Sequence, residues 1–118
     1  MTIGTIAKLL SAEIFTGEEL SEKEARTACG SDLMSDVLAF IKNQSVLITG
    51  LTNSQVVRTA EMMDIVCIVI VRGKRPTDDM VQLAEESGIA VLSTGYSLFT
   101  TCGILYANGL AGGDRILA

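Results

Sequence analysis

The most constraining feature of this sequence is a run of seven apolar residues, 65–71, in which only Cys67 is not β-branched. Such a run, without polar alternation, is typical of a strand that is buried on both faces in the middle of a parallel sheet. Arg72 and Gly73 end the run abruptly. The run therefore predicts a sheet that is covered by other elements on both faces.

Shorter strands and amphipathic helices surround this run. Strands are predicted at about 12–16, 25–29, 45–49 and 90–93. Helices are predicted where apolar side chains recur at helical spacing, and their inward faces are Ile3, Ile6, Ala7 and Leu10; Leu33, Val37, Leu38 and Ile41; Val56, Ala60 and Met63; Met80, Val81 and Ala84; Leu98, Phe99, Cys102, Leu105 and Tyr106. Three successive strand–helix units with short connections predict an α/β fold with a largely parallel sheet of about 4–5 strands.

Polar residues and glycines mark the predicted helix ends. Thr52 and Gln55 fit a capping box, with Thr52 as the N-cap. Thr77 is expected to cap the next helix, and Gly88 to end it. Gly103 interrupts the last helix, where glycine costs about 1 kcal/mol relative to alanine. We therefore expect a close approach by another backbone at Gly103, from the same chain or from a second subunit.

Missing residue types exclude several function classes. The 118 residues contain no histidine, which removes the commonest metal ligand and makes a Ser–His–Asp triad impossible. The three cysteines show no C-x-x-C spacing, so neither a zinc site nor a disulfide framework is indicated. The sequence also lacks the P-loop and dinucleotide-binding glycine motifs. We expect no cofactor, no metal and no enzyme activity, although Lys, Asp and Tyr side chains can do acid–base work.

Charge and hydropathy limit the partners. The net charge is −5, and affinity for nucleic-acid phosphates comes largely from basic faces, so no nucleic-acid partner is expected. No apolar run approaches the roughly 18 residues of a spanning helix, and the first residues lack the basic and apolar regions of a signal peptide. We expect one cytoplasmic domain over residues 1–118, with no membrane partner.

Candidate ligand-binding residues follow the predicted strands. In open α/β sheets, ligands bind beyond the carboxyl ends of the strands, where backbone N–H groups and helix N-termini favour anions. Arg72, Lys74 and Arg75 would neutralise phosphate there, and Asp32 would accept hydrogen bonds from a ribose or base. Hydroxyl groups and backbone donors would come from Thr49, Gly50, Thr52, Asn53, Gly73 and Thr94.

Structural explanations compete with these assignments. Turn geometry and helix capping require glycine and threonine at such positions in any α/β protein. The basic cluster could equally face solvent, and Asp32 and Asp36 could serve only as partners of a helix dipole. Cys29 and Cys102 lack the neighbours expected of a catalytic thiol. Core packing is the expected role of Cys67, Met62, Met63 and Met80.

Three segments resemble the small stand-alone DRTGG-domain proteins. They are GSDLMSDVLA at 30–39, ITGLTN at 48–53 and VRGKRP at 71–76, and the resemblance spans residues 3–110. Residues 72–94 are also similar to the N-terminal domain of HPr serine kinase/phosphorylase. The literal string DRTGG is absent, and the nearest fragment is GGDR at 112–115. The resemblance implies a three-layer α/β/α module, commonly dimeric and regulatory, without the kinase or acetyltransferase activity of larger proteins that contain it.

Two functional hypotheses follow. The first is a non-catalytic regulatory module that binds a small anionic metabolite, with an adenine nucleotide as the leading candidate. The alternative is a ligand-free module that dimerises and docks onto a partner enzyme, motivated by Gly103 and the small-residue tail at 107–118. A third, less favoured hypothesis is a small enzyme that uses Cys29 or Lys74.

Overall fold

One mostly parallel sheet organises the chain. The computed structural model describes residues 1–40 and 44–113, apart from the side chain of Phe40. In this part of the chain five strands pair in the order β1-β5-β4-β3-β2. Their bounds are Glu13–Thr16 for β1, Thr27–Gly30 for β2, Ser45–Thr49 for β3, Ile65–Ile70 for β4 and Ala90–Ser93 for β5. Strands β2 to β5 are parallel and β1 is antiparallel to β5, so the predicted sheet is confirmed.

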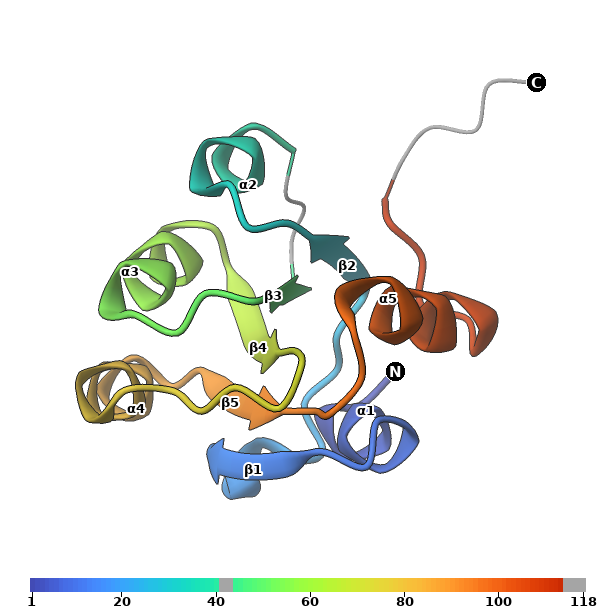
Figure 1. The fold of residues 1–118 in the computed structure, drawn as a ribbon, viewed down its shortest axis with the longest axis horizontal. Helices are drawn as coiled ribbons and strands as arrows, with labels where there is room; N and C mark the ends of the chain where they lie inside the picture. The colour runs from blue at the N-terminus through green and yellow to red at the C-terminus, as the bar shows by residue number, and fades with distance from the viewer. Residues whose placement is uncertain (41–43, 114–118) are drawn as a thin grey trace.

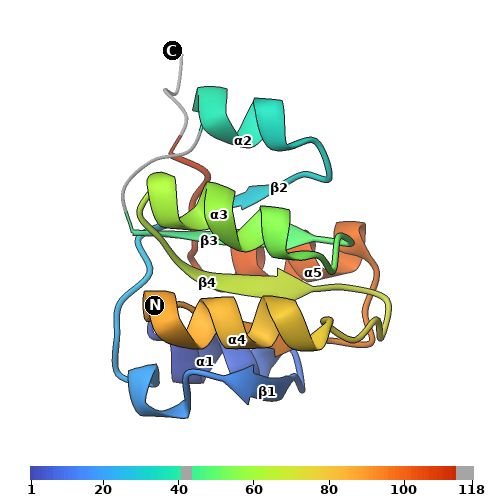
Figure 2. The same cartoon turned by 90° about the vertical axis from the view of Figure 1, so that its left-hand side faces the viewer.

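Helices cover both faces of this sheet (Figures 1 and 2). The first face carries α2 (Met34–Phe40), α3 (Ser54–Met62) and α4 (Asp78–Ser87), each of which connects two neighbouring parallel strands. The opposite face carries α1 (Ile3–Leu9) and α5 (Leu98–Ala107). A 3₁₀ turn, η1 (Glu18–Leu20), lies between β1 and β2. This three-layer α/β/α arrangement confirms the fold class.

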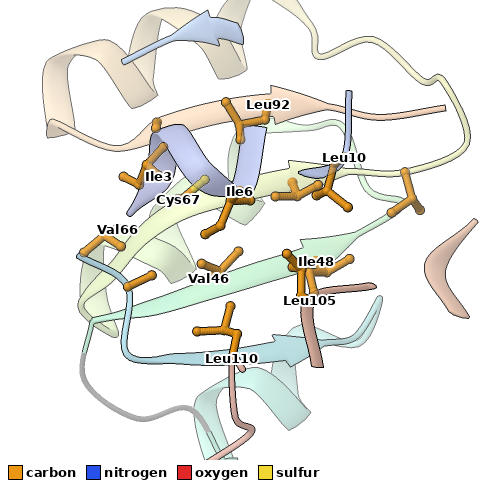
Figure 3. Close-up of a cluster of buried hydrophobic side chains, with 14 residues drawn as sticks. Ile3, Ile6, Leu10, Val46, Ile48, Val66, Cys67, Leu92, Leu105 and Leu110 are labelled. Carbon is orange, nitrogen blue, oxygen red and sulfur yellow. The ribbon is translucent and has the colours of Figure 1, made fainter. Parts of the chain in front are cut away.

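The apolar run occupies the centre of the sheet, as predicted. All six residues of β4 are buried, and β4 lies between β3 and β5. Its side chains enter two separate cores: Val69 packs beneath α1 and α5, whereas Ile68 packs beneath α3 and α4. Figure 3 shows the first core, in which Ile6 of α1 points toward the sheet. Burying one such side chain contributes roughly 1.5–3 kcal/mol, so β4 anchors both layers.

The helix ends agree with the sequence patterns except at α3. Thr77 caps α4 by accepting a hydrogen bond from the Met80 N–H, and Gly88 ends α4 with a left-handed φ of 70°. The N-cap of α3 is Asn53, so the prediction of Thr52 as N-cap was wrong. The carbonyl of Thr52 accepts instead from the Thr77 N–H, which joins the turns before α3 and α4.

Several predicted core residues lie at the surface. Leu33 is 57% and Leu38 44% exposed, because α2 lies at the end of its layer beside the edge strand β2 and buries mainly Val37. Met62 is 72% exposed at the last turn of α3. Ile41, predicted for the inward face of the second helix, lies outside the described residues.

The last helix, α5, also differs from its prediction, which placed Phe99 and Tyr106 on the inward face. This helix buries Thr101 and Leu105, while Phe99 is 87% and Tyr106 75% exposed. The buried stripe of α5 is narrow because only one side of this helix contacts the sheet. Apart from its two chain neighbours and the backbone of α5, no described atom lies within 4 Å of the position that a Cβ on Gly103 would take, so the expected close approach by another backbone segment of the same chain is wrong.

The length and hydropathy of a helix decide whether it can span a membrane. None of the helices in the described residues is both long enough and apolar enough to cross a bilayer.

Candidate anion-binding site

The carboxyl ends of β2, β3 and β4 meet at one edge of the sheet. These strands are neighbours and parallel, so the residues that follow them approach one another. Asp32 follows β2. Thr49 ends β3 and Gly50 follows it, while Arg72 and Lys74 follow β4. The structure therefore brings together five of the predicted site residues. We call this group the Gly50 cluster.

Asp32 binds the turn after β3. Its Oδ1 accepts a hydrogen bond from the Gly50 N–H at 2.6 Å and another from the Thr49 hydroxyl at 2.8 Å. The bond from Gly50 lowers the pKa of the Asp32 carboxyl below its usual value; burial opposes this, and the Thr49 hydroxyl and the charges of Arg72 and Lys74 lower it further. Asp32 is therefore an ionised carboxylate near neutral pH, directed at another strand end and not at the start of its own helix.

Two cations approach the same glycine. Lys74 Nζ donates a 3.0 Å hydrogen bond to the Gly50 carbonyl. A Cβ built on Gly50 would lie 2.7 Å from Arg72 Nη2 and 3.5 Å from both carboxylate oxygens of Asp32. The absence of a side chain at Gly50 thus lets the guanidinium and the carboxylate come close above one peptide unit. Both Arg72 and Lys74 remain exposed to solvent.

Backbone hydrogen bonds hold the basic loop in place. The Arg72 N–H donates to the Tyr96 carbonyl and the Gly73 N–H to the Thr94 carbonyl, each at 2.8 Å. The Ser93 hydroxyl donates to the Lys74 carbonyl at 2.6 Å. Arg72 adopts a left-handed φ of 61°, a conformation that non-glycine residues seldom adopt unless their surroundings impose it. The loop after β5 therefore fixes where the two cations lie.

Other predicted site residues serve different purposes. The Thr94 hydroxyl is buried and donates to the Leu10 carbonyl at 2.8 Å, so it anchors α1. Arg75 turns to β1, where its guanidinium lies 3.7 Å from the Glu13 carboxylate and 4.9 Å from the centre of the Phe15 ring. These two side chains are therefore not part of the cluster. Both side chains instead make contacts within their own fold.

The remaining candidates border the cluster. Thr52 is half-buried in the turn before α3, and Asn53 is the exposed N-cap of α3. Gly73 is exposed with a left-handed φ of 67°. Sequence reasoning missed Ser93 and Tyr96 as supports of the basic loop. Ser93 ends a strand that the sequence predicted and Tyr96 follows it, but each bonds a backbone group of the basic loop, and a backbone partner leaves no residue-type signal.

Two of the three cysteines, Cys67 and Cys102, lack the properties of nucleophiles. Burial raises the pKa of the Cys67 thiol to about 12 and raises the pKa of Cys102 as well. Both therefore stay protonated at neutral pH. No metal-binding group of three or more acidic or cysteine side chains exists among the described residues.

Comparison with known proteins places the chain in a family. The family model of the DRTGG domain matches residues 5–107. The chain belongs to the DRTGG-domain family. No curated protein matches the sequence at a significant level.

A solved structure shares the fold of this DRTGG domain. It comprises the CBS and DRTGG domains of the regulatory region of Clostridium perfringens pyrophosphatase, complexed with the activator diadenosine tetraphosphate. The two superpose with a TM-score of 0.71 at 17% sequence identity, over 99% of this chain and 53% of the other. The DRTGG domain described above thus spans about half of that solved chain. The predicted similarity to HPr serine kinase/phosphorylase stays a prediction.

Proposed function

We propose that this DRTGG domain is a non-catalytic regulatory module that binds a small phosphate-bearing metabolite at the Gly50 cluster, with an adenine nucleotide as the leading candidate. The observation that carries the proposal is the convergence of Arg72 and Lys74 on one residue, Gly50. Two exposed cations beside backbone and hydroxyl donors match the charge and the acceptor oxygens of a phosphate.

The start of α3 adds to this positive environment. Its first turn contains no acidic residue, and within the described residues the N-cap Asn53 makes no side-chain hydrogen bond to the helix. The partial positive charge and the unpaired N–H groups of a helix N-terminus attract anions. Because Asn53 follows Gly50 by three positions, a phosphate at the cluster would lie near this helix end.

An adenine nucleotide is the leading candidate for two reasons. The Clostridium perfringens regulatory region, which shares this fold, is complexed with an activator that contains adenosine and phosphate. A nucleotide also combines a phosphate with hydroxyl and base groups that polar residues at a strand edge can recognise. The regulatory role, the ligand and the absence of catalysis are all parts of this proposal.

Thermal unfolding tests the proposal. The wild-type chain would be heated alone and with millimolar AMP, ADP, ATP, diadenosine tetraphosphate or inorganic phosphate. A ligand at 100 times its Kd adds about 2.7 kcal/mol, which raises the Tm of a domain of this size by several degrees. We expect the rise to disappear in Arg72→Ala/Lys74→Ala and to persist in Arg58→Ala, a control on the exposed side of α3. Equal shifts in all three proteins would contradict the assigned site.

A second candidate function, self-association, rests on α5. Phe99 and Tyr106 are among the most exposed large hydrophobic side chains, Gly103 lies between them, and the helix Leu98–Ala107 carries no charged residue. Around a two-fold axis at Gly103, Phe99 of one copy would face Tyr106 of the other. Four aromatic rings at roughly 150 Å² each would supply about half of the ~1,200 Å² that a stable interface needs.

Light scattering after gel filtration tests this dimer. We expect a dimer at tens of micromolar for the wild type and a monomer for Phe99→Ser/Tyr106→Ser. Leu33→Ser, at the exposed residue just before α2, is a control that leaves the dimer intact. A wild-type monomer would contradict the dimer without affecting the anion site.

A further inference from the structure

We infer that the Asp32 carboxylate occupies the anion position of the Gly50 cluster in the ligand-free protein, and that a phosphate must displace it to bind. This inference rests on the function proposed above and adds a competitor for the site to it. We call this competition between the Asp32 carboxylate and the ligand the gate. Asp32 then competes with the ligand, in contrast to the expectation that it contacts a ribose or base. The ligand class becomes a phosphate monoester dianion.

The hydrogen bonds of Asp32 support a competing role. The Gly50 N–H and the Thr49 hydroxyl each have one proton to donate, and Asp32 Oδ1 accepts both. These are the donors at the strand end that a phosphate between Arg72 and Lys74 would use. A single N–H cannot satisfy two anions at full strength, so the carboxylate and a phosphate exclude each other.

Asp32 is also placed so that it can move away. The residue is exposed, and the backbone next to it is fixed independently of the carboxylate. The Ser31 N–H donates to the Ile48 carbonyl at 3.0 Å, and the Ser31 hydroxyl accepts from the Leu33 N–H at 3.0 Å. A rotation of the Asp32 side chain into solvent would therefore break the two bonds at β3 without unfolding the loop.

Charge balance determines which ligands can displace Asp32. In the ligand-free state the positive charges of Arg72 and Lys74 act on one carboxylate, and Lys74 Nζ donates its hydrogen bond to the Gly50 carbonyl. A monoanion, such as a phosphodiester, would replace one negative charge by one negative charge and gain little. A terminal phosphate carries nearly two negative charges at pH 7 and supplies more acceptor oxygens. The gate thus favours AMP over its cyclic phosphodiester form.

Calorimetric titration tests the gate. AMP, cyclic AMP and inorganic phosphate would be titrated into wild type, Asp32→Asn, Asp32→Ala and Arg72→Ala/Lys74→Ala. Removing a like charge beside a bound anion is expected to lower the Kd for AMP about tenfold in both Asp32 variants. The preference for AMP over cyclic AMP is expected to shrink in parallel. Asp36→Asn is the matched control, because Asp36 is an exposed carboxylate in the first turn of α2. We expect less than a twofold change there.

The possible outcomes separate the gate from the site. An unchanged or higher Kd in both Asp32 variants, with binding lost in Arg72→Ala/Lys74→Ala, overturns the gate and leaves the proposed site standing. Binding that survives in Arg72→Ala/Lys74→Ala overturns the site and the gate together. No binding of any probe to wild type or to either Asp32 variant also overturns both. If Asp32→Asn and Asp32→Ala bind a probe that wild type does not bind, the gate is supported, because these variants differ from wild type only in lacking the competing carboxylate.

Discussion

The carboxylate of Asp32 accepts a 2.6 Å hydrogen bond from the backbone N–H of Gly50, and this bond ties the loop after β2 to the turn after β3. The carbonyl of the same residue accepts a hydrogen bond from Lys74, and the guanidinium of Arg72 lies where a side chain on Gly50 would be. Residues from three successive strand ends thus converge on a single glycine. The predictions below follow from that convergence and from the core that supports it.

A methyl group at Gly50 should weaken anion binding more than it weakens the fold. In Gly50→Ala the new Cβ would lie 2.7 Å from Arg72 Nη2, so the flexible guanidinium must move away. We expect a loss of about tenfold in affinity for AMP, with a change in stability below about 1 kcal/mol. Calorimetric titration and urea unfolding measure the two effects. Gly95→Ala is the control, since its Cβ would meet no described atom within 4 Å. Unchanged affinity in Gly50→Ala would place the ligand elsewhere.

Asp32 should stabilise the fold in a pH-dependent way. Its pKa is lowered in the folded chain by the Gly50 N–H first, and also by Thr49, Arg72 and Lys74. Its contribution is therefore fully present above the unfolded pKa of about 3.9 and is lost as the pH falls through the folded value. Urea unfolding of wild type and Asp32→Asn should give a stability gap that is constant from about pH 7 to 5 and shrinks below about pH 4. A gap that widens with acid would reverse the sign and contradict the hydrogen-bond assignment.

Arg75 should be dispensable for anion binding although it neighbours Lys74 in the sequence. Its side chain lies beside Glu13 and over Phe15 on β1, away from the Gly50 cluster. Because an exposed ion pair contributes only about 0–1 kcal/mol, Arg75→Ala should cost little stability. We expect its affinity for AMP to stay within twofold of wild type, measured in parallel with Arg72→Ala. A loss in Arg75→Ala as large as in Arg72→Ala would show that the whole basic loop acts as one diffuse charge.

The central strand should dominate stability. Ile68 is fully buried in β4 and packs in the core beneath α3 and α4, so Ile68→Ala is expected to cost about 2–5 kcal/mol. Met62→Ala, at a side chain that is 72% exposed, is expected to change stability by less than about 0.5 kcal/mol. Urea unfolding of both variants tests this pair. Similar losses in the free energy of unfolding for both variants would contradict the assignment of Ile68 as buried and Met62 as exposed.

The layout of the sheet could be predicted from local patterns, whereas the breadth of each buried helix face could not. The uninterrupted apolar run required a strand with cover on both faces, and β4 has that position. Leu33, directly before α2, and Phe99 of α5 fit the predicted apolar spacing but are exposed. The number of elements that pack against a helix determines how wide its buried stripe is. That number is a property of the assembled layers, and α2 and α5 each have few neighbours.

In the candidate site, the meeting of the strand ends could be predicted from the sequence, whereas the directions and partners of the side chains could not. The rule that parallel strand ends meet at one edge brought Asp32, Gly50 and Lys74 into one group from the sequence alone. The partner of Asp32 could not be deduced, since it lies 18 residues away and is a backbone N–H that any residue type would offer. The turn of Arg75 toward Phe15 likewise depends on an antiparallel strand at the far side of β5.

The most direct test of the central claim, that the Gly50 cluster binds phosphate, is to follow the backbone amides of ¹⁵N-labelled protein by NMR during titration with AMP. A chain of 12.5 kDa is well suited to this measurement. Displacement of Asp32 from the Gly50 N–H should make the Gly50 amide resonance one of those that shift most, while the Gly103 amide on α5 stays in place. A saturable shift elsewhere that leaves Gly50 unmoved, or no shift at any amide, would contradict the account.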